Sequence, residues 1–227
     1  MNHSLLLSLC VLCAPSLLLS EEPAAPAAPA APADTDHAHH ADAASSGRKM
    51  ELIEGITAED FLRLSTKPNT VELVVAAVFN DDNYGMNFNG YAKGAALYTI
   101  PKGWTVEVTF INPSPVPHSL IVVEKDTLKS IQFKEPYFKG AVVPEAPKHL
   151  VGMAYDKGSF SFVADEAGDY ALACGFPGHA AAGHWIALEI SADAKVPTLK
   201  LGDAEAKAAS PAKAKDEKNA GDAKAAK

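Results

Sequence analysis

The sequence predicts an all-β domain, a Greek-key sandwich or barrel of about seven or eight short strands. Short runs rich in Val, Ile, Phe and Tyr recur through the middle of the 227-residue chain, separated by Gly, Pro and Asp. No long stretch with helical periodicity lies between these runs. We therefore expect antiparallel strands with Greek-key connections between two packed layers.

The elements can be placed in chain order. Thr57-Ala-Glu-Asp60, followed by the residues FLRLS, indicates a short capped helix that ends before Pro68. Segment 103–111 alternates clearly, with apolar residues from Trp104 to Phe110 on one face and polar residues on the other. Strands are expected at 71–79, within 86–101, and at 103–111, 118–124, 158–164, 168–174 and 184–190.

Composition divides the chain into four parts. Residues 1–20 contain an apolar run too short to span a bilayer comfortably, which predicts a secretory signal peptide. Residues 21–47 are rich in Ala, Pro and His, residues 202–227 are rich in Ala and Lys, and both are predicted to be disordered. This leaves 48–201 as the folded domain. We expect a periplasmic or otherwise exported protein without a membrane span, or, alternatively, one tethered by an uncleaved N-terminal segment.

Cysteine usage and charge narrow the possible functions. Cys10 and Cys13 lie in the predicted signal, so Cys174 is the single cysteine of the mature protein and has no partner for an internal disulfide. A lone thiol in an exported protein is expected to be buried or bound to a metal. The net charge of −8 argues against a nucleic-acid partner, and we expect a monomer.

Potential metal ligands gather in the stretch ACGFPGHAAAGHW, which contains Cys174, His179 and His184. The alternation of strand residues places Cys174, His184 and His118 on faces that carry large apolar residues, each at a strand end. His179 lies in the loop between two of these strands, so four donors are expected to converge at one end of the sandwich.

The chemistry of this donor set favours copper. One thiolate and two imidazoles with a weaker axial donor form the coordination of a blue-copper electron-transfer site. Zinc also accepts Cys and His, but its structural sites usually combine several thiolates at short spacing, which this chain lacks. The prediction is one copper ion that cycles between Cu(II) and Cu(I). The alternative for Cys174 is a buried, inert thiol beside incidental histidines.

Three segments resemble the cupredoxin family of blue copper proteins: MNFNGYAKG (86–94), GWTVEVTFINPSPVPHSL (103–120) and YALACGFPGHAAAGHW (170–185). Within that family the chain is similar to the sulfocyanins and, more distantly, to the rusticyanins. The resemblance implies a cupredoxin-like fold with His118, Cys174 and His179 as equatorial copper ligands. The family carries Met where this chain has His184. We hypothesise that this imidazole binds or closely approaches copper, favours Cu(II) and lowers the reduction potential, the alternative being a packed core histidine.

Other residues near these ligands have candidate roles. The resemblance places Ser119 where a hydroxyl braces the ligand loops, the alternative being an ordinary strand serine. Phe176 and Pro177 flank His179 and are candidates for an apolar patch that meets a redox partner, or simply for loop packing. Asn87 and Asn89 are expected to make hydrogen bonds within turns.

The segment DTDHAHHAD (34–42) is a separate motif. Its three histidines could bind Cu(II) or Zn(II) loosely and supply the copper site. The interpretation favoured from sequence is a solvated linker.

The sequence therefore predicts a single-electron carrier in an exported respiratory chain, with a cytochrome or terminal oxidase as its redox partner. The alternative is a copper storage or delivery protein that uses the same site and the His-rich linker. An enzyme is not expected, because a second catalytic copper would need its own histidine cluster and only His149 remains in the core.

Overall fold

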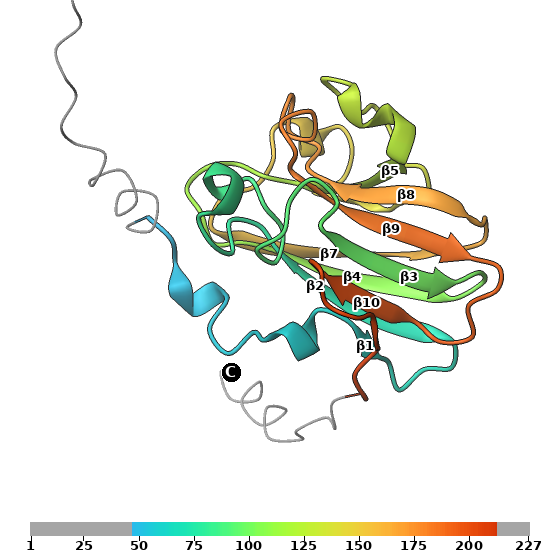
Figure 1. The fold of residues 1–227 in the computed structure, drawn as a ribbon. Coiled ribbons are helices and arrows are strands. Elements are labelled where there is room, and N and C mark those ends of the chain that lie inside the picture. Colours follow the sequence, from blue (N-terminus) through green and yellow to red (C-terminus); the bar gives the residue numbers. More distant parts are fainter. Residues whose placement is uncertain (1–46, 213–227) are drawn as a thin grey trace, which may run out of the picture. The chain divides into compact units, whose positions relative to one another are not determined.

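The structure, a computed structural model, describes residues 47–212 (Figure 1). These residues form a four-stranded and a seven-stranded β-sheet, without any α-helix in the described range. The prediction of an all-β Greek-key sandwich is confirmed. The predicted signal peptide, nearly all of the N-terminal linker and residues 213–227 lie outside the described range.

The strand order is β1-β2-β4-β7 in the smaller sheet and β11-β10-β3-β9-β8-β5-β6 in the larger one. The strands are β1 (Arg63–Leu64), β2 (Thr70–Ala76), β3 (Ala96–Pro101), β4 (Thr105–Asn112), β5 (Leu120–Glu124), β6 (Val142–Val143), β7 (Asp156–Val163), β8 (Gly168–Ala173), β9 (Trp185–Ser191), β10 (Thr198–Leu201) and β11 (Lys207–Ala208). Five short 3₁₀ helices lie in the described range: η1 (Met50–Leu52) and η2 (Ala58–Asp60) before β1, and η3 (Asp82–Gly85), η4 (Lys125–Lys129) and η5 (Lys148–Leu150) between strands.

The main core lies between the two sheets. In β4 the alternating Val106, Val108 and Phe110 are buried, as their spacing predicted. Strand β5 is apolar on both faces up to Val123: Leu120 and Val122 belong to the main core, whereas Ile121 and Val123 pack in a second cluster on the outer side of the sheet. The larger sheet is therefore covered on both faces near β5 and β8, which holds the ends of these strands rigidly.

The sheets are mixed, which corrects the expectation of a purely antiparallel sandwich. Strand β2 pairs with β4 in parallel, and β3 pairs with β9 in parallel. Side chains alternate with the same period in parallel and antiparallel strands, so the apolar pattern contains no information on strand direction.

The segment 57–65 also differs from expectation. Thr57 and Asp60 form the predicted capping box, with the Thr57 N–H donating to the Asp60 carboxylate at 3.0 Å. The helix ends after a single 3₁₀ turn, however, because Arg63 and Leu64 pair with β2 instead. The alternative pairing with a sheet edge thus overrides the local helix signal.

The ordered chain continues beyond the expected domain end at residue 201. Strand β11 pairs with β10, and the Ser210 N–H donates to the Leu62 carbonyl at 3.0 Å. The first residues assigned to the C-terminal tail therefore complete an edge of the larger sheet. Within residues 47–212 no helix has the length and apolarity that crossing a membrane requires.

Candidate metal centre

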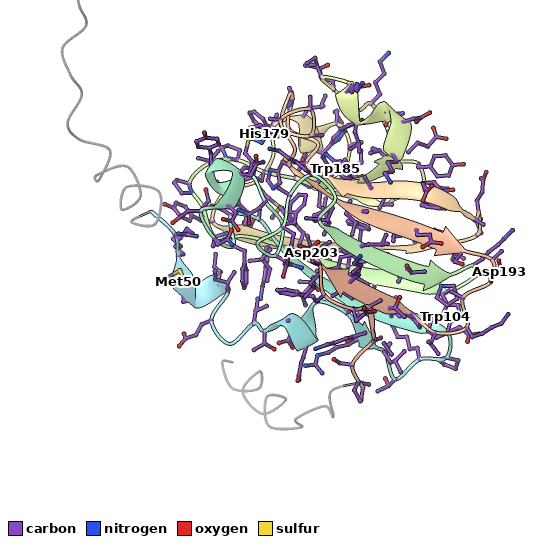
Figure 2. The ribbon with its side chains drawn as sticks, viewed as in Figure 1. Met50, Trp104, His179, Trp185, Asp193 and Asp203 are labelled. Atoms are coloured by element: carbon purple, nitrogen blue, oxygen red, sulfur yellow. The ribbon has the colours of Figure 1, made fainter. Side chains whose placement is uncertain are left out.

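Four potential ligands meet at one end of the sandwich. His118 precedes β5, Cys174 follows β8 and His184 precedes β9, while His179 lies in the loop between β8 and β9, where Figure 2 labels it. One ligand atom from each of the four side chains lies within 4.8 Å of those of the other three. The structure thus brings together all four of the residues that the sequence singled out.

Backbone hydrogen bonds fix the positions of these residues. The Cys174 N–H donates to the His184 carbonyl at 3.0 Å, and the His184 N–H donates to the His179 carbonyl at 3.0 Å. His118 and Met153 exchange a pair of backbone hydrogen bonds at 3.1 and 2.8 Å. Three of the four candidate ligands therefore lie beside strand ends, and the loop residue His179 is tied by its carbonyl to one of them, so the rigid sheet limits their movement.

The side chains are oriented toward a common point. The Cys174 Sγ lies 3.8 Å from His118 Nδ1 and 3.5 Å from His179 Nδ1. The His184 Nε2 lies 3.1 Å from the Asn87 carbonyl oxygen, which can only accept, so Nε2 carries the proton. The other ring nitrogen of His184, Nδ1, is buried without a hydrogen-bond partner. Its lone pair is therefore available to a metal ion.

His179 is more exposed to solvent than the other three candidate ligands. Cys174 and His184 are fully buried, and His118 is 2% exposed, whereas His179 is only partly covered. The Phe88 ring packs against His184 with centroids 4.1 Å apart, and the Phe176 ring covers His179 at 4.5 Å. The His179 imidazole is thus the part of the cluster nearest to solvent.

The surroundings keep all four side chains uncharged at neutral pH. Burial, and then the neighbouring His179, lowers the pKa of His118 to about 3. Burial likewise lowers the pKa of His179 and, more strongly, that of His184. Burial raises the pKa of the Cys174 thiol to about 11, although backbone N–H groups of Ser119 and Phe176 oppose this effect.

This arrangement fits a single copper ion. Buried imidazoles that are already unprotonated offer free lone pairs, and the unpartnered Nδ1 of His184 is a buried polar atom that a metal would satisfy. A soft sulfur together with imidazole nitrogens is a donor set that copper prefers. The His-Cys-His-His cluster could therefore hold one copper ion.

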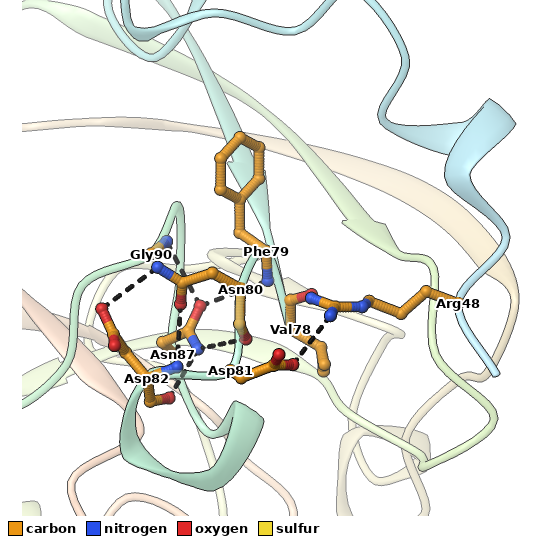
Figure 3. Close-up of polar contacts among 8 residues, drawn as sticks. All are labelled: Arg48, Val78, Phe79, Asn80, Asp81, Asp82, Asn87 and Gly90. Carbon is orange, nitrogen blue, oxygen red and sulfur yellow. Dashed lines mark hydrogen bonds and ion pairs between the residues drawn. The ribbon is translucent and has the colours of Figure 1, made fainter. Parts of the chain in front are cut away.

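The loop between β2 and β3 contacts the cluster through the hydrogen bond between Asn87 and His184. As expected, the buried amide of Asn87 makes hydrogen bonds within the loop: its Nδ2 donates to the Asn80 and Asp82 carbonyls at 3.0 and 2.7 Å (Figure 3). Asn89 differs from the expectation, because its Oδ1 accepts from the Ala76 N–H of β2 at 2.8 Å and so joins the loop to the strand. Sequence reasoning missed the Asn87 carbonyl as the partner of His184. A backbone carbonyl is common to all residue types, so only the MNFNG motif indicated this loop.

The remaining candidates lie around the cluster. Ser119 is fully buried, and its N–H and hydroxyl favour the Cys174 thiolate, although the hydroxyl makes no full hydrogen bond to another described residue. Phe176 and Pro177 are partly exposed beside His179. His149 stands apart from the four donors, with its Nε2 donating to the Phe133 carbonyl at 2.8 Å. The bracing role of Ser119 stays a prediction.

Residues 57–138 and 148–200 match the family described as "Sulfocyanin (SoxE) domain". The chain belongs to the sulfocyanin family. This cupredoxin membership agrees with the resemblance of the sequence motifs. A sulfocyanin from Sulfolobus acidocaldarius is 33% identical to this chain over 144 residues, which cover 59% of this chain and 69% of that protein.

Solved cupredoxin structures are also similar to this sulfocyanin-family chain. A structure of reduced rusticyanin has 22% sequence identity, covers 66% of this chain and 94% of its own, and has a TM-score of 0.40. A dithionite-reduced auracyanin from Roseiflexus castenholzii has 18% identity, covers 53% of this chain and 96% of its own, and has a TM-score of 0.36.

Proposed function

We propose that this protein is a blue copper electron carrier that accepts and donates single electrons. The observation that carries the proposal is the cluster of Cys174, His118, His179 and His184, whose ligand atoms lie within 4.8 Å of one another at a rigid, apolar end of the sandwich. When bound, copper would supply the one-electron Cu(II)/Cu(I) couple. An enzymatic activity is not part of the proposal.

The chain contributes rigidity and exclusion of water. The strand ends and the hydrogen bonds among the ligand residues limit their movement, so little rearrangement accompanies a change of charge at the centre. Phe88 packs against the buried ring of His184, and Phe176 covers part of the His179 ring, which limits the access of water to the cluster. Such a site suits fast electron transfer better than catalysis on a bound substrate.

His184 is proposed as the fourth ligand, through Nδ1. The Asn87 carbonyl fixes its proton on Nε2 and thereby presents the unprotonated nitrogen to the cluster. Imidazole is a harder donor than a thioether, so it favours Cu(II) and lowers the reduction potential. Each tenfold change in the relative affinity for Cu(II) and Cu(I) corresponds to about 59 mV for a one-electron couple.

The partner is proposed to dock around His179. Phe176 and Pro177 are partly exposed there, and the nearby Val116 is 51% exposed, so the partly covered imidazole is surrounded by apolar surface. Such a surface suits brief contact with a redox protein of the cytochrome or terminal oxidase type. The apolar run at residues 5–19 supports a location outside the cytoplasm.

The experiment is copper reconstitution of the purified protein, followed by visible absorption, EPR and voltammetry. We expect an intense thiolate-to-copper band and a reversible one-electron wave. Cys174→Ser should abolish the band, whereas His184→Met should keep it and raise the potential. A colourless copper-loaded protein would refute the proposal, and an unchanged potential in His184→Met would remove His184 from the ligand set.

The rival function is copper storage or delivery with the same site. A storage or delivery protein should give up its copper rapidly to a chelator, whereas a carrier should retain copper through many redox cycles. The amount of copper that the protein retains during repeated oxidation and reduction in the presence of a chelator distinguishes an electron carrier from a storage or delivery protein.

A further inference from the structure

Strand β7 has a free edge. In the described part of the chain it pairs only with β4, at the margin of the smaller sheet. The Ala164 N–H donates to the Trp104 carbonyl at 2.9 Å, and successive residues of a strand turn their backbone groups to opposite sides. The N–H and C=O groups of Ser159, Ser161 and Val163 therefore face away from β4, toward the free side of the strand.

The second half of β7 lacks the features that usually protect such an edge. Edge strands avoid pairing with another chain by means of charged side chains, proline or a bulge. In β7 the charged residues are Asp156 and Lys157 at its beginning, and stretch 159–163 contains neither a charge nor a proline. Val163, at the end of the strand, is 50% exposed. This half of β7 can therefore accept a further strand.

A groove with a volume of about 650 Å³ lies beside this half of β7. It is lined by residues 161–163 of β7 and by segment 137–139, which belongs to the connection between η4 and β6. The Phe138 ring stacks on Phe162 with centroids 4.9 Å apart, and the Tyr137 N–H donates to the Val122 carbonyl of β5 at 2.8 Å. The groove thus lies between elements that packing and hydrogen bonds hold in place.

Negative charge predominates around the groove. The exposed carboxylates that line it or the adjoining surface belong to Glu124, Asp126, Asp165, Glu166 and Asp169, and the lysines there are Lys125 and Lys139. Glu124 and Glu166 both act electrostatically on the Tyr170 hydroxyl, so the two groups of carboxylates adjoin each other. A positively charged occupant complements this surface.

We propose that this edge binds an extended segment of a partner protein that carries Lys or Arg, and that the segment adds a strand to β7. Backbone hydrogen bonds to Ser159, Ser161 and Val163 would provide affinity, and the carboxylates of Asp165 and Glu166 would select cationic side chains. A second copy of this chain is a poorer occupant, because it brings the same carboxylates and a net charge of −8.

The groove lies at the end of the sandwich opposite to the metal centre. Strand β8 begins just after Asp165 and Glu166 and ends next to Cys174, and its six residues span about 20 Å. Figure 2 likewise labels Trp104, whose carbonyl binds β7 through Ala164, far from His179. A segment bound to β7 therefore leaves the surface around His179 uncovered, and its binding does not depend on the proposed function.

The test measures the binding of a fluorescent, end-capped peptide of alternating Lys and Thr to the full-length protein by fluorescence anisotropy. Ser161→Pro removes an outward N–H of β7 and leaves the pairing with β4 intact. Ala208→Pro is the matched control on the edge strand β11: the Ala209 N–H donates to the Pro197 carbonyl, so the N–H of Ala208 also faces outward. Hydrogen exchange by mass spectrometry locates the bound peptide.

A second pair of variants tests the charge. Asp165→Asn combined with Glu166→Gln neutralises the end of the groove, and Asp203→Asn combined with Glu205→Gln makes the same change of charge at exposed positions elsewhere. We expect Ser161→Pro to weaken peptide binding at least about tenfold, and the groove charge variant to weaken it and reduce its dependence on salt. Both controls should bind like the unmodified protein, and exchange should slow in β7.

Absence of peptide binding to the unmodified protein, or unchanged binding in both groove variants, would overturn the inference. A dimer that Ser161→Pro dissociates, detected by sedimentation, would assign the edge to a second copy and overturn it as well. If circular dichroism shows that Ser161→Pro does not fold, a peptide methylated at every backbone nitrogen replaces this variant. Such a peptide cannot donate backbone hydrogen bonds, so undiminished binding of it would refute strand addition.

Discussion

The buried, uncharged histidines predict that the copper-free protein loses stability as the pH falls. His118 has its pKa lowered to about 3, whereas in the unfolded chain it has the ordinary value of 6.5. Between these values the unfolded state binds a proton that the folded state excludes, so the free energy of unfolding decreases as pH falls. The loss begins near pH 6.5 and is fully developed below about pH 3.

The size of the effect follows from the difference in pKa. Each pH unit within this window costs about 1.4 kcal/mol for one imidazole, so His118 alone removes about 2 kcal/mol between pH 6.5 and pH 5. Over the whole window His118 removes about 5 kcal/mol, which is comparable to the total stability of many domains. His184 and His179 act in the same direction because burial lowers their pKa values too.

Urea unfolding of the apoprotein, followed by far-UV circular dichroism, measures this dependence between pH 7 and pH 5, where most carboxylates stay ionised. In the variant His118→Gln, residue 118 cannot take up a proton. The free energy of unfolding of this variant should therefore change less steeply with pH, because the contribution of one imidazole is missing. Copper-loaded protein should resist acid longer, because bound imidazoles cannot take up protons. A free energy of unfolding that stays constant from pH 7 to pH 5, or an unchanged slope in His118→Gln, would refute the reasoning.

Three further predictions concern the site and its support. Copper binding should release about one proton near pH 8, because the Cys174 thiol has a pKa of about 11 and must lose its proton to bind as a thiolate. Calorimetry in two buffers with different ionisation enthalpies measures the number of protons released. The absence of proton release would contradict a thiolate ligand. Gly175→Ala should destabilise the protein by about 1–3 kcal/mol in urea unfolding, because a Cβ there would lie 2.8 Å from the His149 ring and 3.0 Å from the Ser119 hydroxyl. Asn89→Ala should lower the free energy of unfolding by about 1–3 kcal/mol, because the Asn89 amide makes hydrogen bonds to buried backbone groups. A smaller loss, measured by thermal unfolding, would mean that water replaces these hydrogen bonds.

Sequence patterns predicted the strands and the convergence of the donors for a common reason. Alternation assigns each residue to a face, and Cys174, His118 and His184 each border a strand on a buried face. Once the strands are neighbours in one sheet, side chains at their adjoining ends must approach each other. β5, β8 and β9 are such neighbours and pair antiparallel, so the start of β5, the end of β8 and the start of β9 lie at the same edge of the sheet, as the expected antiparallel pairing requires.

Other features have no signature in residue types. The parallel pairing of β3 with β9 depends on how the whole chain is threaded, and the sequence pattern is the same for either direction. The Asn87 carbonyl that holds His184 belongs to the backbone. The groove beside β7 requires residues 137–139 and 161–166, which are separate in the sequence, to be placed together.

The long separations between the members of the metal centre determine when it can exist. His118 lies 56 residues before Cys174, and the Asn87 carbonyl lies 97 residues before the imidazole it orients. Contacts between such distant segments form late in folding, because the intervening loops must close first. A nascent or half-folded molecule therefore has no place for copper, and metal insertion belongs to the finished fold. By then packing already covers the sulfur, which shields it from oxidants before any ion arrives.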